Sequence, residues 1–114
     1  MTQASEPAPG EPISLTDQAA FDEHVGEYDV VLVDFYADWC GPCRMMEPAV
    51  ESLASDTDAA VLKVDVDRYQ ELAAEYGVQG IPTLLVFDGG EMADRMVGAQ
   101  TEDALREAVA SRLN

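Results

Sequence analysis

The sequence contains few cysteines, few basic residues and no long apolar run, and each shortage excludes a class of protein. Its longest apolar runs are tetrapeptides such as Val30–Val33 and Leu84–Phe87, whereas a membrane-spanning helix needs roughly 20 apolar residues. Only 6 lysine and arginine residues oppose 23 acidic ones, and the net charge of −17 repels phosphate backbones and anionic lipids. We therefore expect no nucleic-acid partner and no membrane partner. Two cysteines are too few for the multi-disulfide framework of a small secreted scaffold.

The composition predicts one folded domain preceded by a short tail. A chain of 114 residues, 47% of them hydrophobic, is long enough for one continuous core and too short for two. Residues 1–12 contain three prolines and a glycine but no apolar run, so we predict a flexible tail there and a domain at residues 13–114. The tail has neither the basic start nor the apolar stretch of a secretory signal, so we expect no export and a cytoplasmic location.

Strand-like and helix-like patterns alternate from residue 13 onwards. Val30–Tyr36 is an almost continuous run of β-branched and aromatic residues, as expected for a central strand buried on both faces. Two later runs, Thr83–Phe87 and Glu91–Val97, flank an Asp-Gly-Gly turn that predicts an antiparallel hairpin. The full order is β-α-β-α-β-α-β-β-α. It predicts an α/β fold with a parallel core sheet, an antiparallel C-terminal hairpin at its edge and helices on both faces.

A Cys-Gly-Pro-Cys motif stands where the central strand passes into a helix. Unpaired N–H groups and the dipole at a helix N-terminus stabilise a thiolate, which makes a cysteine there nucleophilic. Cys43 continues an apolar helix stripe through Met46 and should face the interior, whereas Cys40 precedes the first turn and should be exposed. We therefore predict that Cys40 attacks a partner disulfide and that Cys43 resolves the mixed disulfide. Pro42 at the helix start keeps the two sulfur atoms within reach.

Two other interpretations of the cysteine pair remain open. A structural zinc site needs about four ligands, and the sequence adds only one histidine, His24, on a separate helix. An inert disulfide across so short a loop would constrain the unfolded chain very little. The sequence also lacks a glycine-rich phosphate loop, so we expect no nucleotide or flavin. The expected redox group is the Cys40–Cys43 pair itself, with no bound metal and no other cofactor.

Four segments resemble the thioredoxin family in their order and spacing: VDFYADWCGPCRMMEP, KVDVD, GIPTLLVF and VGA. The resemblance runs from about Ile13 to Leu113 and leaves out only the tail. It implies the thioredoxin fold, with a mixed sheet between two layers of helices. It also implies a protein disulfide reductase, a monomer that carries electrons from a reductase of the thioredoxin reductase type to client proteins with disulfides.

The resemblance implies roles for residues around the cysteines. Asp34 is expected to act as general base for Cys43 through water, although a strand-edge aspartate that reaches solvent would also explain it. Lys63, the only lysine, would approach Asp34 and modulate its pKa, or would be an ordinary surface lysine. Pro82 would be a cis-proline packed against the dithiol, or simply the first residue of a strand.

Further residues are expected, from the same resemblance, to shape the site or to bind clients. The site-shaping residues are Trp39, Gly41, Pro42 and Pro82. An apolar collar that accepts client proteins consists of Trp39, Val66, Ile81, Val97, Gly98 and Ala99. Ordinary loop and core packing would explain Val66 and Val97 almost as well.

Two other functions remain open beside the reductase. An oxidase or isomerase would use the same exchange chemistry in the other direction, and a non-catalytic binding module would not use the dithiol at all. The Gly-Pro pair between the cysteines resembles the reducing members of the superfamily. Tyr36, Asp38 and Arg44 depart from the commonest family pattern, and the charge of Asp38 opposes thiolate formation at Cys40.

The negative charge is spread over the predicted domain. Only Glu6 and Glu11 lie within residues 1–12, so the domain itself carries 21 acidic and 6 basic residues. Docking onto basic partners is one explanation. The other is solubility in concentrated salt, where the Debye length falls to about 3 Å and self-repulsion is screened. We favour the second and predict the acidic surface of a halophilic protein.

Overall fold

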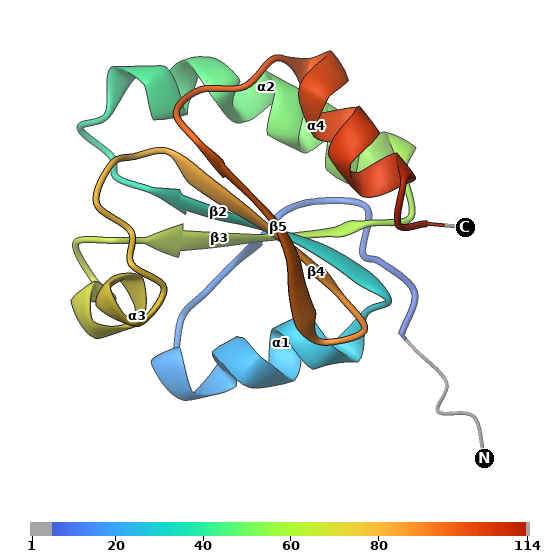
Figure 1. The fold of residues 1–114 in the computed structure, drawn as a ribbon, viewed down its shortest axis with the longest axis horizontal. Coiled ribbons are helices and arrows are strands. Elements are labelled where there is room, and N and C mark those ends of the chain that lie inside the picture. The colour runs from blue at the N-terminus through green and yellow to red at the C-terminus, as the bar shows by residue number, and fades with distance from the viewer. Residues whose placement is uncertain (1–5, 114) are drawn as a thin grey trace.

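The computed structural model describes residues 6–113, which form a sheet covered by helices on both faces (Figure 1). The order of strands and helices is the one that the sequence predicts, with a 3-10 turn before the first helix. None of the helices in this part of the chain is long and apolar enough to cross a membrane. In chain order the elements are β1 (Ile13–Ser14), η1 (Gln18–Ala20), α1 (Phe21–Glu27), β2 (Val30–Tyr36), α2 (Gly41–Asp56), β3 (Ala60–Asp65), α3 (Gln70–Glu75), β4 (Thr83–Asp88), β5 (Glu91–Val97) and α4 (Glu102–Ala110).

The sheet is mixed, with the strand order β1-β3-β2-β4-β5. β1, β3 and β2 run parallel, whereas β4 is antiparallel to β2 and β5 is antiparallel to β4. The predicted mixed sheet is confirmed: the hairpin of β4 and β5 forms one side of the sheet, with β5 at the edge and β4 beside β2. β4 returns antiparallel because β3 ends and β4 begins beside the same end of β2, where Tyr36 pairs with Asp65 and Phe35 with Thr83.

Side chains that alternate along β2 give the sheet two buried faces. Val31 and Val33 pack on the face covered by α1 and α3, and Val30 and Leu32 pack on the face covered by α2 and α4 (Figure 1). In a strand, residues two apart point to the same side. The same alternation therefore directs Asp34, two residues after Leu32, toward α2.

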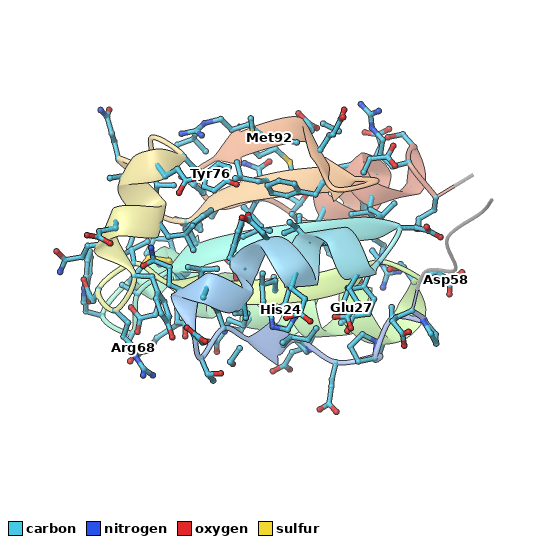
Figure 2. The ribbon with its side chains drawn as sticks, turned by 90° about the horizontal axis from the view of Figure 1, so that it is seen from below. His24, Glu27, Asp58, Arg68, Tyr76 and Met92 are labelled. Carbon is cyan, nitrogen blue, oxygen red and sulfur yellow. A yellow bond between two sulfur atoms is a disulfide. The ribbon has the colours of Figure 1, made fainter. Side chains whose placement is uncertain are left out.

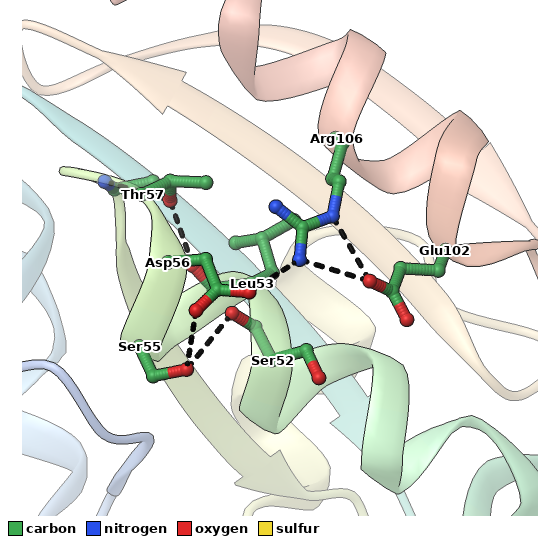
Figure 3. Close-up of polar contacts among 8 residues, drawn as sticks. Ser52, Leu53, Ser55, Asp56, Thr57, Glu102 and Arg106 are labelled. Carbon is green, nitrogen blue, oxygen red and sulfur yellow. Dashed lines mark hydrogen bonds and ion pairs between the residues drawn. The ribbon is translucent and has the colours of Figure 1, made fainter.

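Each of the six basic side chains contacts another part of the chain. Arg106 of α4 donates to Asp56 of α2 at 2.8 Å and to Glu102 at 3.0 Å, which joins the two helices on that face (Figure 3). The others reach a carboxylate, a backbone carbonyl or an aromatic ring: Arg44, Lys63, Arg68, Arg95 and Arg112. Only Lys63, Arg106 and Arg112 among them pair with a carboxylate, so most of the acidic side chains have no basic partner within the described residues.

Residues 6–12 run along the domain. The backbone N–H of Glu6 donates to the carbonyl of Glu27 at 3.0 Å, and Ala8 packs against the core on the α1 side. This part of the predicted flexible tail is attached to the domain, while residues 1–5 lie outside the described residues. The composition gave no sign of the attachment, because a backbone hydrogen bond and one alanine make the contacts.

Candidate functional site

Cys40 and Cys43 form a disulfide where the chain leaving β2 enters α2. Their Cα atoms are 5.3 Å apart, and Cys40 is the N-cap residue of the helix. The backbone N–H of Cys43 donates to the Cys40 Sγ at 3.2 Å. A thiolate on Cys40 would receive this hydrogen bond together with the positive end of the helix dipole, and both favour the ionised sulfur.

The prediction that Cys40 is exposed is wrong for this disulfide form. Cys40 is 4% exposed, close to the 3% of Cys43. Its sulfur is bonded to Cys43 and lies 3.9 Å from the carbonyl oxygen of Ile81, and Tyr36 and Val66 also pack against the pair. A position just before a helix does not decide exposure here, because residues from distant parts of the chain cover the sulfur.

The loop that faces the disulfide contains Ile81 and Pro82. The peptide bond between these two residues is cis, and Pro82 is buried. The carbonyl of Pro82 accepts a hydrogen bond from the N–H of Gly98 at 2.8 Å, and the Thr83 hydroxyl donates to the carbonyl of Gly80. The first bond joins the loop to the chain after β5, and the second closes the loop on itself. The Ile81 carbonyl lies beside Cys40.

Asp34 is a buried carboxyl group on β2. It is 2% exposed, so the alternative of a strand-edge aspartate that reaches solvent does not hold. Its Oδ1 has no hydrogen-bond partner among the residues that the structure describes. Burial raises the pKa of this carboxyl from 3.8 to about 6, while the charge of Lys63 lowers it and that of Glu47 raises it. A carboxyl with such a pKa can both accept and release a proton near neutral pH.

Lys63 lies next to Asp34 in the register of β2 and β3. Its side chain is only 16% exposed, so it is not an ordinary surface lysine. Its ammonium group pairs with Glu47 of α2, with 3.3 Å between Nζ and Oε2, and lies 4.4 Å from the centre of the Tyr36 ring. The site therefore contains a third charged group that the sequence analysis did not include.

Glu47 is the residue of α2 near the cysteines that sequence reasoning missed. Glu47 lies four residues after Cys43, and residues at that spacing share one face of a helix, so the spacing was a usable signal. Met45 is 83% exposed, whereas its neighbour Met46 is buried. Helical spacing distinguishes the two methionines, but it does not assign a role to the exposed one.

The chain around Cys40 presents three other predicted residues at the surface. Gly41 and Pro42 are exposed in the first turn of α2. Trp39 is a large exposed hydrophobic residue, and its Nε1 donates to the carboxylate of Asp67 at 2.9 Å. This hydrogen bond ties the segment before the cysteines to the turn after β3.

The structure brings the remaining members of the predicted collar to the same end of the sheet. Val66 and Ile81 pack against the disulfide. Val97 ends β5 as an exposed apolar residue, and Gly98 is bonded to the Pro82 loop. Ala99 follows at the surface. Val66 and Ile81 therefore border the cysteine pair, and residues 97–99 lie beside the loop that contains Ile81.

The residues that a zinc site would need are not together. No group of three or more His, Cys, Asp or Glu side chains able to hold a metal ion occurs within residues 6–113. His24 lies on α1, on the opposite face of the sheet from α2, and its Nδ1 is 3.8 Å from Glu27 (Figure 2). The zinc interpretation of the cysteine pair therefore has no support.

Known proteins resemble the chain over most of its length. The family described as Thioredoxin matches residues 12–111. Proteins named Thioredoxin from Staphylococcus haemolyticus and Staphylococcus epidermidis are 46% and 47% identical to it over 103 residues, which is 89% of this chain and 97% of each relative. Thioredoxins need no bound cofactor, and they pass electrons from a reductase to proteins with disulfides.

Solved structures share the fold as well as the sequence. A mutant thioredoxin from Halobacterium salinarum superimposes with a TM-score of 0.91 at 51% identity, over 96% of this chain and 97% of that one. A thioredoxin from Plasmodium falciparum gives 0.78 at 33% identity, over 87% and 97%. Together with the cysteine pair at the start of α2, these similarities decide both the family and the reaction. The chain belongs to the thioredoxin family and is a thiol–disulfide oxidoreductase that reduces protein disulfides through Cys40 and Cys43.

Proposed function

We propose that the reduction proceeds in two exchange steps, with Cys40 as the nucleophile and Cys43 as the resolving thiol. The Cys40 thiolate attacks one sulfur of the client disulfide, forms a mixed disulfide and releases the other client sulfur as a thiolate, which takes up a proton. The Cys43 thiolate then attacks the Cys40 sulfur and releases the second client thiolate. The client gains two electrons and the Cys40–Cys43 disulfide forms, until a reductase returns two electrons.

The hydrogen bond from the Cys43 N–H to the Cys40 Sγ carries this assignment. It provides Cys40 with a donor at a helix N-terminus, which is the environment that favours a thiolate. Cys43 lies one turn further into the helix, where a base is needed to remove its proton. Asp34 serves as that base through a water molecule, supported by its burial, its direction toward α2 and its unpartnered Oδ1. Lys63 modulates the proton affinity of Asp34.

The collar residues bind the client beside the cysteines. Trp39, Gly41, Pro42 and the cis-proline Pro82 shape the surface, and an extended client segment pairs with the backbone next to Pro82. Support comes from the apolar side chains around the disulfide and from the Ile81 carbonyl beside Cys40. Such pairing is independent of the client's side chains, which suits a reductase with many clients.

The proposal extends to the oligomeric state, the location and the cofactor requirement of the protein. Residues 13–114 act as one catalytic domain and a monomer in the cytoplasm. Neither a metal nor an organic cofactor takes part, because the dithiol carries both electrons. A reduction potential far more oxidising than a cytosolic glutathione pool would favour the oxidase or isomerase instead.

The reaction of the wild-type protein should be measurable both by turbidity and by the fluorescence of its tryptophan. We expect the reduced protein to reduce a two-chain substrate whose chains precipitate once their disulfides open, which is followed as turbidity. The fluorescence of Trp39, the only tryptophan, should change in step as the neighbouring disulfide forms. If neither turbidity nor fluorescence changes, the reductase role is wrong.

The acidic surface is proposed to be an adaptation to concentrated salt. The chain has 23 acidic residues against 6 basic ones, and this excess, together with the similarity to the Halobacterium salinarum protein, supports this interpretation. Two like charges 10 Å apart in water repel by about 0.4 kcal/mol when unscreened. At 1 M salt the Debye length is about 3 Å, so repulsion over such distances largely disappears.

The melting temperature should therefore rise by at least about 10 °C between dilute buffer and roughly 2 M KCl, since 1 kcal/mol corresponds to about 4–8 °C for a domain of this size. A triple variant with glutamine at Glu71, Glu91 and Glu107, which are exposed, should melt higher in dilute buffer and gain less from salt. An unchanged melting temperature across this range of KCl would instead favour docking onto basic partners.

A further inference from the structure

The ammonium group of Lys63 has two carboxyl groups within its neighbourhood but pairs with only one. Strand register places Lys63 directly beside Asp34. Within residues 6–113, however, the ion pair that Lys63 makes is with Glu47, at 3.3 Å. The Tyr36 ring, 4.4 Å from Nζ, supports the ammonium from β2. The lysine is therefore held by α2 and β2 rather than by Asp34.

Asp34 is left without a fixed counter-ion as a result. Its Oδ1 has no hydrogen-bond partner among the described residues although the side chain is buried. The charged and titratable groups that act on it or lie beside it are Lys63 on β3, Tyr36 on its own strand and Glu47 on α2, while its partner on β4 is the uncharged Leu84. Only Lys63 carries a positive charge among these groups.

We propose that Glu47 is a positioning residue, whose carboxylate holds the Lys63 ammonium away from Asp34 and so keeps that carboxyl free to exchange a proton with Cys43. The inference rests on the role proposed above for Asp34. Glu47 and Lys63 also line one surface cavity of about 290 Å³ between α2 and β1, together with Glu11 and Glu51. Glu47 acts through Lys63 and touches no reacting atom.

The direction of the effect follows from charge. An ammonium beside a buried carboxylate stabilises its ionised form and lowers its pKa, whereas a second carboxylate raises it. Lys63 lowers the pKa of Asp34 and Glu47 raises it. Removing the Glu47 charge removes the second influence and also frees Lys63 to turn toward Asp34. Both changes make Asp34 a weaker base.

The test is a Glu47→Gln variant, with the Asp34 carboxyl followed directly by NMR titration of its carboxyl carbon. We expect the Asp34 pKa to fall by about one pH unit in this variant. Glu47 is 45% exposed and glutamine has the same shape, so the fold should be kept. Glu51→Gln is the matched control, because Glu51 lines the same cavity and is exposed; it should leave the Asp34 pKa unchanged.

A Lys63→Gln background shows whether the lysine transmits the effect. There, Glu47→Gln should lower the Asp34 pKa by less than half as much as in the wild-type background. An unchanged Asp34 pKa in Glu47→Gln, or an equal fall with and without Lys63, overturns the positioning role. If the Asp34 pKa falls but the pH midpoint of mixed-disulfide resolution does not follow, Glu47 positions Lys63 as inferred and the role of Asp34 as base is wrong.

Discussion

The Cys43→Ser variant is expected to remain covalently attached to its client after a single attack. Cys40 can still form the mixed disulfide, since its sulfur keeps the helix N-terminus and the backbone N–H of residue 43. Without the second thiol, no group on the protein can attack the Cys40 sulfur. Catalytic turnover should fall to the level of buffer, and a one-to-one complex should appear on a non-reducing gel and by mass spectrometry.

The Cys40→Ser variant is the matched control for this covalent complex with the client. It should also lose turnover but should form no complex, because the backbone N–H at the start of α2 that favours a thiolate is donated to the sulfur of Cys40 and not to that of Cys43. A complex formed by Cys40→Ser and not by Cys43→Ser would reverse the two roles. A double serine variant with full cellular function would show that the protein is a binding module instead.

The Asp34→Asn variant should be more stable than the wild-type protein by about 3 kcal/mol at pH 8. The carboxyl has a pKa near 3.8 when the chain is unfolded and about 6 when it is folded. Because the folded pKa is the higher one, the contribution of this group to stability is present below pH 3.8 and is lost as the pH rises through 6. Two pH units of difference correspond to about 3 kcal/mol, which asparagine avoids because it stays uncharged.

Chemical denaturation at several pH values checks this prediction. The gain in the free energy of unfolding should be near zero at pH 3.5, should grow between pH 4 and 6, and should level off above pH 7. Asp38→Asn removes a nearby but exposed carboxylate and should give no such gain. An equal stability of wild type and Asp34→Asn at pH 8 would mean that the carboxyl is solvated in solution. The variant should resolve mixed disulfides more slowly, since the base is missing.

The sequence predicted the fold from patterns that act locally. The apolar run Val30–Tyr36 formed the central strand, and the Asp-Gly-Gly turn formed the hairpin. It did not predict that β4 would pair antiparallel with β2. That pairing depends on where the connection through α3 returns the chain, and no residue pattern records the direction of a connection.

The candidate site was predictable where residue type and spacing carry the chemistry. The cysteine motif and the strand aspartate were found in this way, and Asp34 is buried as its neighbours in the strand indicated. The exposure of Cys40 was mispredicted because Val66 and Ile81, which are distant in the sequence, pack against it and shield it from solvent. Glu47 was missed although its spacing from Cys43 put it on the same helix face, because its partner Lys63 lies on β3 and no residue pattern records an ion pair between a helix and a distant strand.

The engagement of every basic side chain within the molecule has a consequence for association kinetics. A surface with a large net negative charge speeds the encounter with basic partners at low ionic strength and slows the encounter with acidic ones. The same salt that relieves self-repulsion in the fold removes this long-range attraction. In concentrated salt, encounter rates therefore lose their dependence on partner charge, and under the client-binding role proposed for the collar the choice among clients falls to short-range apolar contacts beside Cys40.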